Sequence, residues 1–411
     1  MTRRLKFSRS IYVFPPFIRI STIVRIAFTR PGFVYIQIRF AAACVEFLKR
    51  QADKLNLPVD VIHPVLPSKP VVIMKWLGKR PELPSILLNS HMDVVPVFAE
   101  NWTHDPFGAS MDAEGRIYAR GTQDMKSVGC QYLAATRALK SSGYQPKRTV
   151  YLTYVPDEET GGDMGMAEFV KGDYFRAMNV GFALDEGIAS EDESYPVFYA
   201  ERTLWHLRLK FTGTSGHGSL LHKNTAGEKF QYVMDKLMKF RKTQVQHLAE
   251  NSSLDIGDVT TLNLTQLTGG LQSNVVPPVL EAVFDIRIAI SQDVDRLEKQ
   301  IRNWGEEAGG GLELDFILRC PFVETKVDDS NPYWLAFKKG LDELGLKTHT
   351  RVFTGATDSF YVRQMGIPAL GFSPINNTPV LLHNHDEYLR ADTYLHGIQV
   401  YRKLIPAVAD S

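Results

Sequence analysis

Histidine and acidic side chains occur at five separate places in this chain, and most of them closely follow a short apolar run. The places are His91, Asp124, Glu158 with Glu159, Glu186 and His383. An apolar run such as residues 86–88 is typical of a buried parallel strand, and a polar residue behind it lies at the carboxyl end of that strand. Open α/β sheets bind their ligands at that end. Because imidazoles and carboxylates bind metals, the five places together indicate a metal site assembled from strand ends.

Each place also has an ordinary structural explanation when it is taken alone. Asp124 directly precedes an expected helix at residues 126–139, where an acidic residue is a common N-cap. Asp157, Glu158 and Glu159 form an acidic run that is typical of a solvated loop. Three adjacent carboxylates repel one another, however, and one would take up a proton unless cations were near. A solvated loop therefore predicts that water surrounds this acidic run, whereas a metal site predicts cations beside it.

Three pairs of neighbouring residues leave alternatives open. His91 and Asp93 share one face of an extended chain, where the carboxylate can accept the second N–H of a metal-bound imidazole. The alternative for this pair is an Asp-rich turn. The other two choices lie between Asp185 and Glu186, and between His383 and His385. Oxygen-rich ligands with one or two imidazoles fit two zinc-class ions that share a bridging carboxylate.

Composition excludes several classes of protein. The 411 residues are too many for one ordinary core and predict two domains. A net charge of +1 gives no overall field for nucleic acid. No apolar run approaches the roughly 20 residues that a membrane span needs. Three widely spaced cysteines, Cys44, Cys130 and Cys320, indicate a reduced, cytoplasmic environment without a disulfide framework.

Residues 1–40 form an atypical basic N-terminal segment. Arginines and lysines recur in it, and the first acidic residue of the chain is Glu46. An irregular start is one interpretation, and an organelle targeting segment is the other. A secretory signal peptide fits poorly, since the apolar stretch at residues 11–18 is short and contains two prolines.

Hydrophobic periodicity predicts a βαβ region followed by a region of different pattern. The first region has expected helices at 41–55 and 126–139, and expected strands at 71–76, 86–89, 149–155 and 180–184. The second contains, in order, strands and helices at 204–211, 226–242, 259–267, 281–290 and 294–304. These are the first five elements of a β-α-β-β-α-β order, which predicts an inserted ferredoxin-like domain. An α/β pattern resumes near residue 321, with a helix at 332–344. The expected domains are residues 41–198, 199–318 and 319–411, the first and last forming one catalytic domain.

Six long motifs carry a resemblance to a known family from about residue 80 to the end. They are SILLNSHMDVVPV, GRIYARGTQDMKSVG, FALDEG, FTGTSGHGS, GGLQSNVVP and GFSPINNTPVLLHNHDE. With these motifs the chain closely resembles the M20 family of co-catalytic zinc amidohydrolases and peptidases, and within it the aminoacylase group. The resemblance implies a di-zinc αβα-sandwich catalytic domain with an inserted ferredoxin-like α+β domain that serves dimerisation and acts as a lid. Residues 1–40 do not look like the usual start of the family.

The resemblance also implies a metal-ligand set of two zinc ions per subunit. It makes Asp124 the bridge, His91 and Glu186 ligands of one zinc, and Glu159 and His383 ligands of the other. His383 is preferred to His385 because the ligand of the family lies four residues before a glutamate, here Glu387.

The remaining roles implied by the resemblance concern catalysis and substrate. Glu158 corresponds to the general base and Asp93 to the residue that orients His91. His217 corresponds to a histidine that reaches the active site of the dimer partner, although a structural turn histidine is the alternative. Asn274 and Arg287 match residues that contact the carbonyl or carboxylate region of the substrate. The alternative for Arg287 is a strand arginine in a salt bridge.

We therefore expect a cytoplasmic homodimer that hydrolyses N-acyl-L-amino acids to a free amino acid and a carboxylate. An M20 dipeptidase is the nearest alternative. A metal-free binding protein with this fold would have lost a ligand or the base, whereas all five ligand positions and Glu158 are intact.

Overall fold

The computed structural model describes residues 32–411, with side chains described from residue 41. Most of the basic segment predicted at residues 1–40, namely residues 1–31, lies outside the described part. The chain forms two compact units. The first contains the described chain up to Tyr199 together with Glu324–Arg351 and Thr357–Ser411, and the second contains Ala200–Val323 with Val352–Ala356. Among the described residues, no helix is long and apolar enough to cross a membrane.

The first described element is helix α2, which spans Gly32–Leu55. The predicted helix at residues 41–55 is confirmed, but α2 begins nearer the N-terminus than periodicity indicated. From Ala41 onward its core contacts recur at helical spacing, with Cys44, Leu48 and Ala52 fully buried. The helix therefore contributes one continuous apolar face to the core of the first unit.

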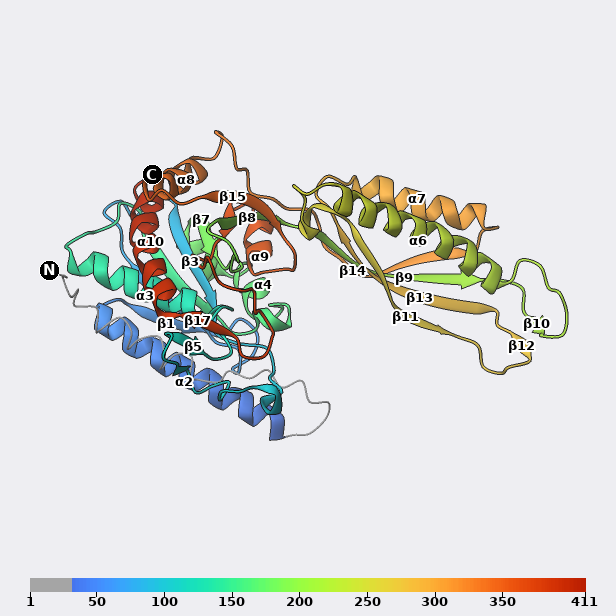
Figure 1. The fold of residues 1–411 in the computed structure, drawn as a ribbon, viewed down its shortest axis with the longest axis horizontal. Helices are drawn as coiled ribbons and strands as arrows, with labels where there is room; N and C mark the ends of the chain where they lie inside the picture. Colours follow the sequence, from blue (N-terminus) through green and yellow to red (C-terminus); the bar gives the residue numbers. More distant parts are fainter. Residues whose placement is uncertain (1–31) are drawn as a thin grey trace. The chain divides into compact units, whose positions relative to one another are not determined.

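An eight-stranded mixed sheet forms the centre of the first unit (Figure 1). In spatial order its strands are β1 (Val59–Ile62), β2 (Val71–Trp76), β6 (Val150–Val155), β3 (Ser85–His91), β7 (Val180–Asp185), β16 (Ala369–Gly371), β8 (Tyr195–Glu201) and β15 (Thr348–Phe353). The four central strands, from β6 to β16, run parallel, whereas β2 is antiparallel to β6. The carboxyl ends of β6, β3 and β7 consequently meet at one edge of the sheet.

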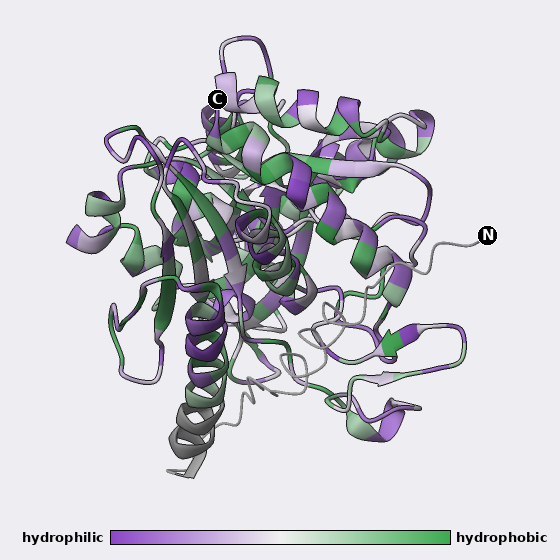
Figure 2. Ribbon diagram, turned by 90° about the vertical axis from the view of Figure 1, so that its left-hand side faces the viewer, coloured by the Kyte–Doolittle hydropathy of each residue, from purple (hydrophilic) through white to green (hydrophobic). Residues whose placement is uncertain are grey.

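Helices cover both faces of this sheet and complete an αβα sandwich. The end of α2 lies on one face with α3 (Lys126–Ser141), α8 (Pro332–Glu343) and α10 (Ala391–Ala409). The other face carries α4 (Met166–Phe169), α5 (Asp173–Met178) and α9 (Ser359–Gln364). Leu88 belongs to the first core and Leu87 to the second, since successive strand residues point to opposite faces. Hydrophobic and hydrophilic residues alternate along the surrounding helices (Figure 2).

A small three-stranded sheet joins two segments that are far apart in the sequence. It contains β4 (Ser110–Met111), β5 (Arg116–Tyr118) and β17 (Tyr388–Arg390). Strands β5 and β17 are antiparallel, with Tyr118 opposite Tyr388. This pairing places the chain just before Asp124 beside the chain just after His383. Short 3-10 turns lie at η1 (Ala99–Asn101), η2 (Glu158–Thr160) and η3 (Ile256–Asp258).

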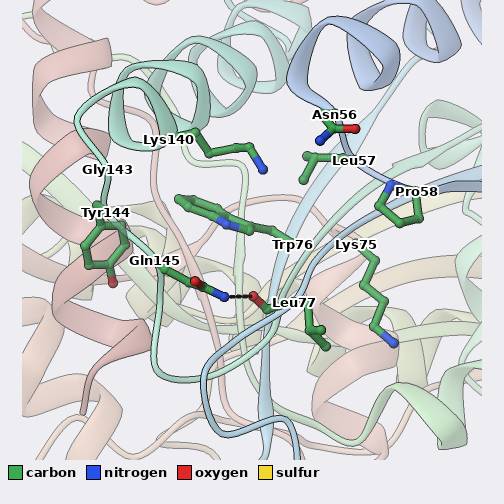
Figure 3. Close-up of a pocket in the computed structure, with 10 residues that line it drawn as sticks. All are labelled: Asn56, Leu57, Pro58, Lys75, Trp76, Leu77, Lys140, Gly143, Tyr144 and Gln145. Carbon is green, nitrogen blue, oxygen red and sulfur yellow. Dashed lines mark hydrogen bonds between the residues drawn. The ribbon is translucent and has the colours of Figure 1, made fainter.

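A cavity of about 480 Å³ opens between the ends of α2 and β2 and the turn after α3 (Figure 3). Trp76 forms its apolar wall, with the Tyr144 ring at 5.8 Å and the Lys140 ammonium at 5.7 Å from the indole. Because Trp76 pairs with Val150, at the start of β6, the cavity lies at the amino ends of the parallel strands. None of the candidate metal ligands lines it.

The second unit confirms the predicted β-α-β-β-α-β order. Its elements are β9 (Thr203–Thr212), α6 (Ala226–Glu250), β11 (Thr261–Gly269), β13 (Val279–Ile288), α7 (Val294–Glu307) and β14 (Leu312–Arg319). The antiparallel sheet has the order β11-β13-β9-β14 of a ferredoxin-like fold. Trp205 and Phe211 are among the alternate residues of β9 that are buried against α6 and α7. A separate two-stranded ribbon pairs β10 (Gly216–His217) with β12 (Val275–Val276).

Candidate metal centre

Three of the candidate ligands lie at or just after the carboxyl ends of adjacent parallel strands. His91 is the last residue of β3 and stands opposite Val155, the last residue of β6. Glu159 lies in the turn η2 that follows β6, and Glu186 follows the last residue of β7. The convergence that the apolar runs predicted is therefore present in the fold.

Asp124 connects the two imidazoles of the site. Its Oδ1 lies 2.9 Å from His91 Nε2, and its Oδ2 lies 3.2 Å from His383 Nε2. The N-cap of α3 is Met125, without a side-chain capping bond, so Asp124 does not cap this helix. A carboxylate that turns one oxygen to each of two imidazoles has the geometry of a bridging ligand.

The acidic candidates divide between the two imidazoles. Glu186 Oε2 lies 3.5 Å from His91 Nε2, and Glu159 Oε2 lies 3.1 Å from His383 Nε2. Glu158 Oε2 is more distant, at 4.0 Å from His91 Nε2. Ligand atoms lie within 4.8 Å of one another in two groups: His91, Asp124 and Glu159, and His91, Glu158 and Glu186.

The neighbours of His385 and Asp185 distinguish them from the residues that face the cluster. His385 Nε2 lies 3.4 Å from Asn101 Nδ2 rather than beside Asp124. The Asp185 carboxylate accepts hydrogen bonds from Asn89 Nδ2 at 3.1 Å and from Ser359 Oγ at 3.0 Å. Glu186 and His383 are thus the members of their pairs that contact the other candidate ligands.

Asp93 contacts His91 through its main chain as well as its side chain. His91 Nδ1 lies 3.0 Å from the Asp93 carbonyl oxygen and 3.5 Å from Asp93 Oδ1. The shorter contact is a hydrogen bond that fixes the ring with Nε2 directed at Asp124, whereas the longer one exceeds ordinary hydrogen-bond length. Asp93 Oδ2 instead accepts from the Glu159 amide at 3.2 Å. Asp93 therefore contacts residues on both sides of the cluster.

Burial and mutual repulsion shift the pKa values of the acidic cluster. Burial, and then the charge of Glu186, raises the pKa of Glu158 well above its usual range. Burial and the charge of Asp124 raise the pKa of Glu159 to about 7. Burial also opposes ionisation of Asp124, but hydrogen bonds from His383 and His91 hold its pKa well below the ordinary value. Hydrogen bonds that the His383 imidazole donates to Asp124 and Glu159 raise the pKa of His383 to about 10.

The donor set of this cluster fits divalent metal ions. Buried carboxylates that repel one another are stabilised by cations, and a zinc-class ion binds imidazole nitrogens and carboxylate oxygens. Glu159 Oε1 and Asp93 Oδ1 are buried and have no hydrogen-bond partner among the described residues. The cluster thus has both uncompensated charge and acceptor atoms available to a cation.

His217 and Asn274 lie together in the second unit, although the sequence separates them widely. His217 in β10 stands opposite Val275 in β12, and the Asn274 carbonyl accepts from the Gly218 amide at 2.7 Å. Ser219 Oγ lies 2.8 Å from His217 Nδ1, and the side chains of His217 and Asn274 are both exposed. The ribbon therefore presents two polar groups at one surface.

Arg287 lies at the other end of β13 from this ribbon (Figure 1). From Val279 to Arg287 the strand rises roughly 27 Å. Arg287 Nε and Nη2 donate to Asp285 at 2.9 and 3.1 Å, which is the salt bridge that the sequence left as an alternative. Arg287 and the ribbon that carries His217 therefore lie at opposite ends of β13.

Sequence reasoning missed the polar network that supports these ligands. In the sequence, the spacing to Glu387 indicated only that His383 is preferred to His385 as the ligand. In the fold, the Glu387 carboxylate is fully buried and accepts several hydrogen bonds from the segment that carries Asp124. Asp358 is also buried, and its Oδ1 has no hydrogen-bond partner among the described residues. Isolated polar residues of this kind give no periodic signal by which a single sequence identifies them.

An αβα sandwich with a cluster of acidic and imidazole groups at its strand ends fits a metal-dependent hydrolase. Residues 87–407 match the peptidase family M20/M25/M40, and the chain belongs to this family.

Relatives of similar length share nearly half of its residues. Mouse aminoacylase-1 is 48% identical over 89% of this chain and 90% of its own length. Human aminoacylase-1 is 46% identical over the same shares, and the Dictyostelium discoideum aminoacylase-1 is 42% identical over 88% and 91%.

Solved structures share the fold at low sequence identity. An M20 family metallo-carboxypeptidase from Sulfolobus solfataricus has a TM-score of 0.70 at 17% identity, covering 98% of this chain and 99% of its own. A Bacillus subtilis protein described as a dinuclear metal binding peptidase of the M20 family has a TM-score of 0.70 at 14% identity, covering 97% and 98%.

Proposed function

We propose that this protein is an aminoacylase, which hydrolyses N-acyl-L-amino acids to a free L-amino acid and a carboxylate. The observation that carries the proposal is the Asp124 carboxylate, whose two oxygens face His91 and His383 at 2.9 and 3.2 Å. The aminoacylase-1 relatives, which are 42–48% identical over most of the chain, support the substrate class.

The cluster would hold two zinc ions per subunit, and Asp124 would be a ligand of both. His91 and Glu186 would complete one position, and Glu159 and His383 the other. Zinc held there would supply a coordinated water whose pKa is lowered to near 7, and a Lewis acid for an amide carbonyl. The chain's own part is to fix these ligands: His91 by its strand and by the Asp93 carbonyl, and Glu186 by the end of β7.

Glu158 is the general base in this proposal. It is adjacent to the ligand Glu159 but stands 4.0 Å from His91 Nε2, so it is the acidic residue least engaged by the imidazoles. Burial and the charge of Glu186 raise its pKa, which increases its ability to hold a proton near neutral pH. Glu158 takes the proton from the attacking water and transfers it to the leaving nitrogen.

Residues of the second unit would contact the substrate. His217 donates a hydrogen bond to the developing oxyanion, and Asn274 contacts the carbonyl region. The planar guanidinium of Arg287 can donate two parallel hydrogen bonds to the free carboxylate of an N-acyl amino acid. This substrate carboxylate would compete with Asp285 for the Arg287 guanidinium. The wide separation of His217 from Arg287 along β13 supports a homodimer in which His217 serves the partner's site.

Three cysteines without disulfides support a reduced, cytoplasmic location. An M20 dipeptidase remains the second candidate, because the fold is shared with peptidases.

Parallel assays of N-acetyl-L-methionine and a dipeptide with a free amino group separate the two functions. We expect the acylated amino acid to have the larger kcat/KM. A larger kcat/KM for the dipeptide would overturn the proposed substrate class.

A further inference from the structure

Glu387 binds the segment that carries Asp124. Its carboxylate is fully buried, and it lies at the end of the loop that carries His383. Oε2 accepts from Arg120 Nη1 at 2.8 Å and from the Gly121 amide at 3.1 Å. Oε1 accepts from the amides of Gln123 at 2.6 Å and Asp124 at 3.3 Å. One side chain from the His383 loop thereby fixes the main chain at Asp124.

Gln123 makes the reciprocal set of contacts from the Asp124 side. Its Nε2 donates to the carbonyl oxygens of Pro379 at 3.0 Å and Tyr388 at 2.9 Å. Its Oε1 accepts from the Leu381 amide at 3.0 Å. Both ends of this amide are therefore committed to main-chain groups on either side of His383.

His383 needs such support more than His91 does. His91 is fully buried at a strand end, whereas the His383 side chain is 55% exposed on a loop. The main chain of His383 also has a φ of +63°, which disfavours side chains other than glycine. Such a conformation persists only where surrounding contacts determine it.

We infer that Gln123 and Glu387 form a reciprocal clamp that sets the position of His383 relative to Asp124 before any metal binds. Both are positioning residues, since they are buried and contact the main chain that carries the metal-ligand candidates. The clamp fixes one metal position in particular, because His91 and Glu186 are already held by β3 and β7. This inference rests on the metal site of the proposed function.

Zinc titration of metal-free protein against a chromophoric chelator tests the clamp. The test variant is Gln123→Met, which keeps the bulk of the side chain and removes its hydrogen bonds. The matched control is Gln131→Met, since Gln131 is a buried glutamine of α3 that donates at 3.2 Å to the Tyr394 carbonyl in α10 and not to the main chain on either side of His383. Glu387→Gln is a second test variant, because its amide would place a donor against main-chain donors.

We expect Gln123→Met to weaken one zinc position at least about tenfold and the other by less, as loss of a supporting hydrogen bond does elsewhere. Gln131→Met should leave both affinities within about twofold of the wild-type values. Equal losses at both positions, or losses matched by Gln131→Met, would overturn the clamp. A wild-type protein that binds no zinc would instead overturn the proposed function, and the clamp with it.

Hydrogen exchange of the metal-free wild-type protein gives a second measurement that does not depend on a variant folding. The amides of Leu381 and Gln123 should be protected without metal, because their acceptors belong to the clamp. Rapid exchange of both amides until zinc is added would show that metal, and not the clamp, orders the loop.

Discussion

The two compact units hold their candidate residues in opposite ways. In the first unit His91, Asp124 and Glu186 are buried together, and their charges interact directly. In the second unit His217 and Asn274 are exposed on a ribbon, and Arg287 is paired near the other end of β13. The buried, mutually repelling carboxylates of the first unit are stabilised by cations even when no substrate is bound. The second offers hydrogen-bond donors that become useful only when a substrate or another subunit reaches them.

The largest expected effect comes from Glu158→Gln in the first unit. Loss of the proton acceptor should lower kcat by on the order of 10³-fold. Zinc content should stay at the wild-type value, because Glu158 is not a ligand in this account. Metal analysis alongside the assay of N-acetyl-L-methionine checks both parts. Activity that persists would show that another group is the base, and loss of zinc would show that Glu158 is a ligand.

His217→Ala in the second unit should have the next largest effect. Removal of an oxyanion donor lowers kcat by roughly 10²- to 10³-fold, and zinc content should not change. Mixing this variant with Glu158→Gln subunits should restore up to about a quarter of wild-type activity if random heterodimers form with one intact site. Subunit exchange must be verified independently, for example by mass spectrometry of tagged subunits. Exchange without any recovery would show that His217 does not act across subunits.

Arg287→Lys should mainly weaken substrate binding. Lysine keeps the charge but cannot bind both oxygens of a carboxylate, so KM should rise about tenfold with a smaller change in kcat. Arg208→Lys is the matched control, since Arg208 lies on the neighbouring β9 and pairs with Asp315 at 2.9 Å. An equal rise in KM in both variants would show that Arg287 has only a structural role in its strand.

The smallest effect concerns the stability of the metal-free first unit against pH. Burial and Asp124 raise the pKa of Glu159 from 4.5 to about 7, so the folded state holds a proton that the unfolded chain releases. Stability should therefore fall as pH rises from 4.5 to 7. Hydrogen bonds that His383 donates to Asp124 and Glu159 raise its pKa from 6.5 to about 10, which extends the fall in stability through that pH range.

Thermal unfolding with chelator present measures this dependence. The zinc-loaded protein should not lose stability between pH 4.5 and 7 in the same way, because metal binding favours the deprotonated ligands. A metal-free protein that gains stability across the range would contradict the electrostatic description of the cluster.

Much of the first unit could be predicted from sequence because its signals are regular. Buried strands such as β3 and β7 are continuous apolar runs, and parallel strands necessarily bring the residues behind them to one edge. The choice between Asp185 and Glu186 needed the family motif, since a shift of one residue reverses the direction of a side chain. The early start of α2 was missed because its first residues, GFVYIQIRF, are rich in β-branched and aromatic types that favour strands.

The supporting contacts could not be predicted, for a physical reason. Gln123 and Glu387 are in contact although more than half of the chain separates them in sequence, and neither is part of a periodic pattern. Likewise, the pairing of β10 with β12 depends on tertiary structure, so the proximity of His217 and Asn274 appears only in the fold.

The most direct test of the central claim is the hydrolysis of N-acetyl-L-methionine by the purified protein with and without chelator. We predict steady hydrolysis by protein carrying two zinc ions per subunit, loss of activity when a chelator removes them, and recovery when zinc is restored. Full activity of protein shown to contain no metal would contradict the account.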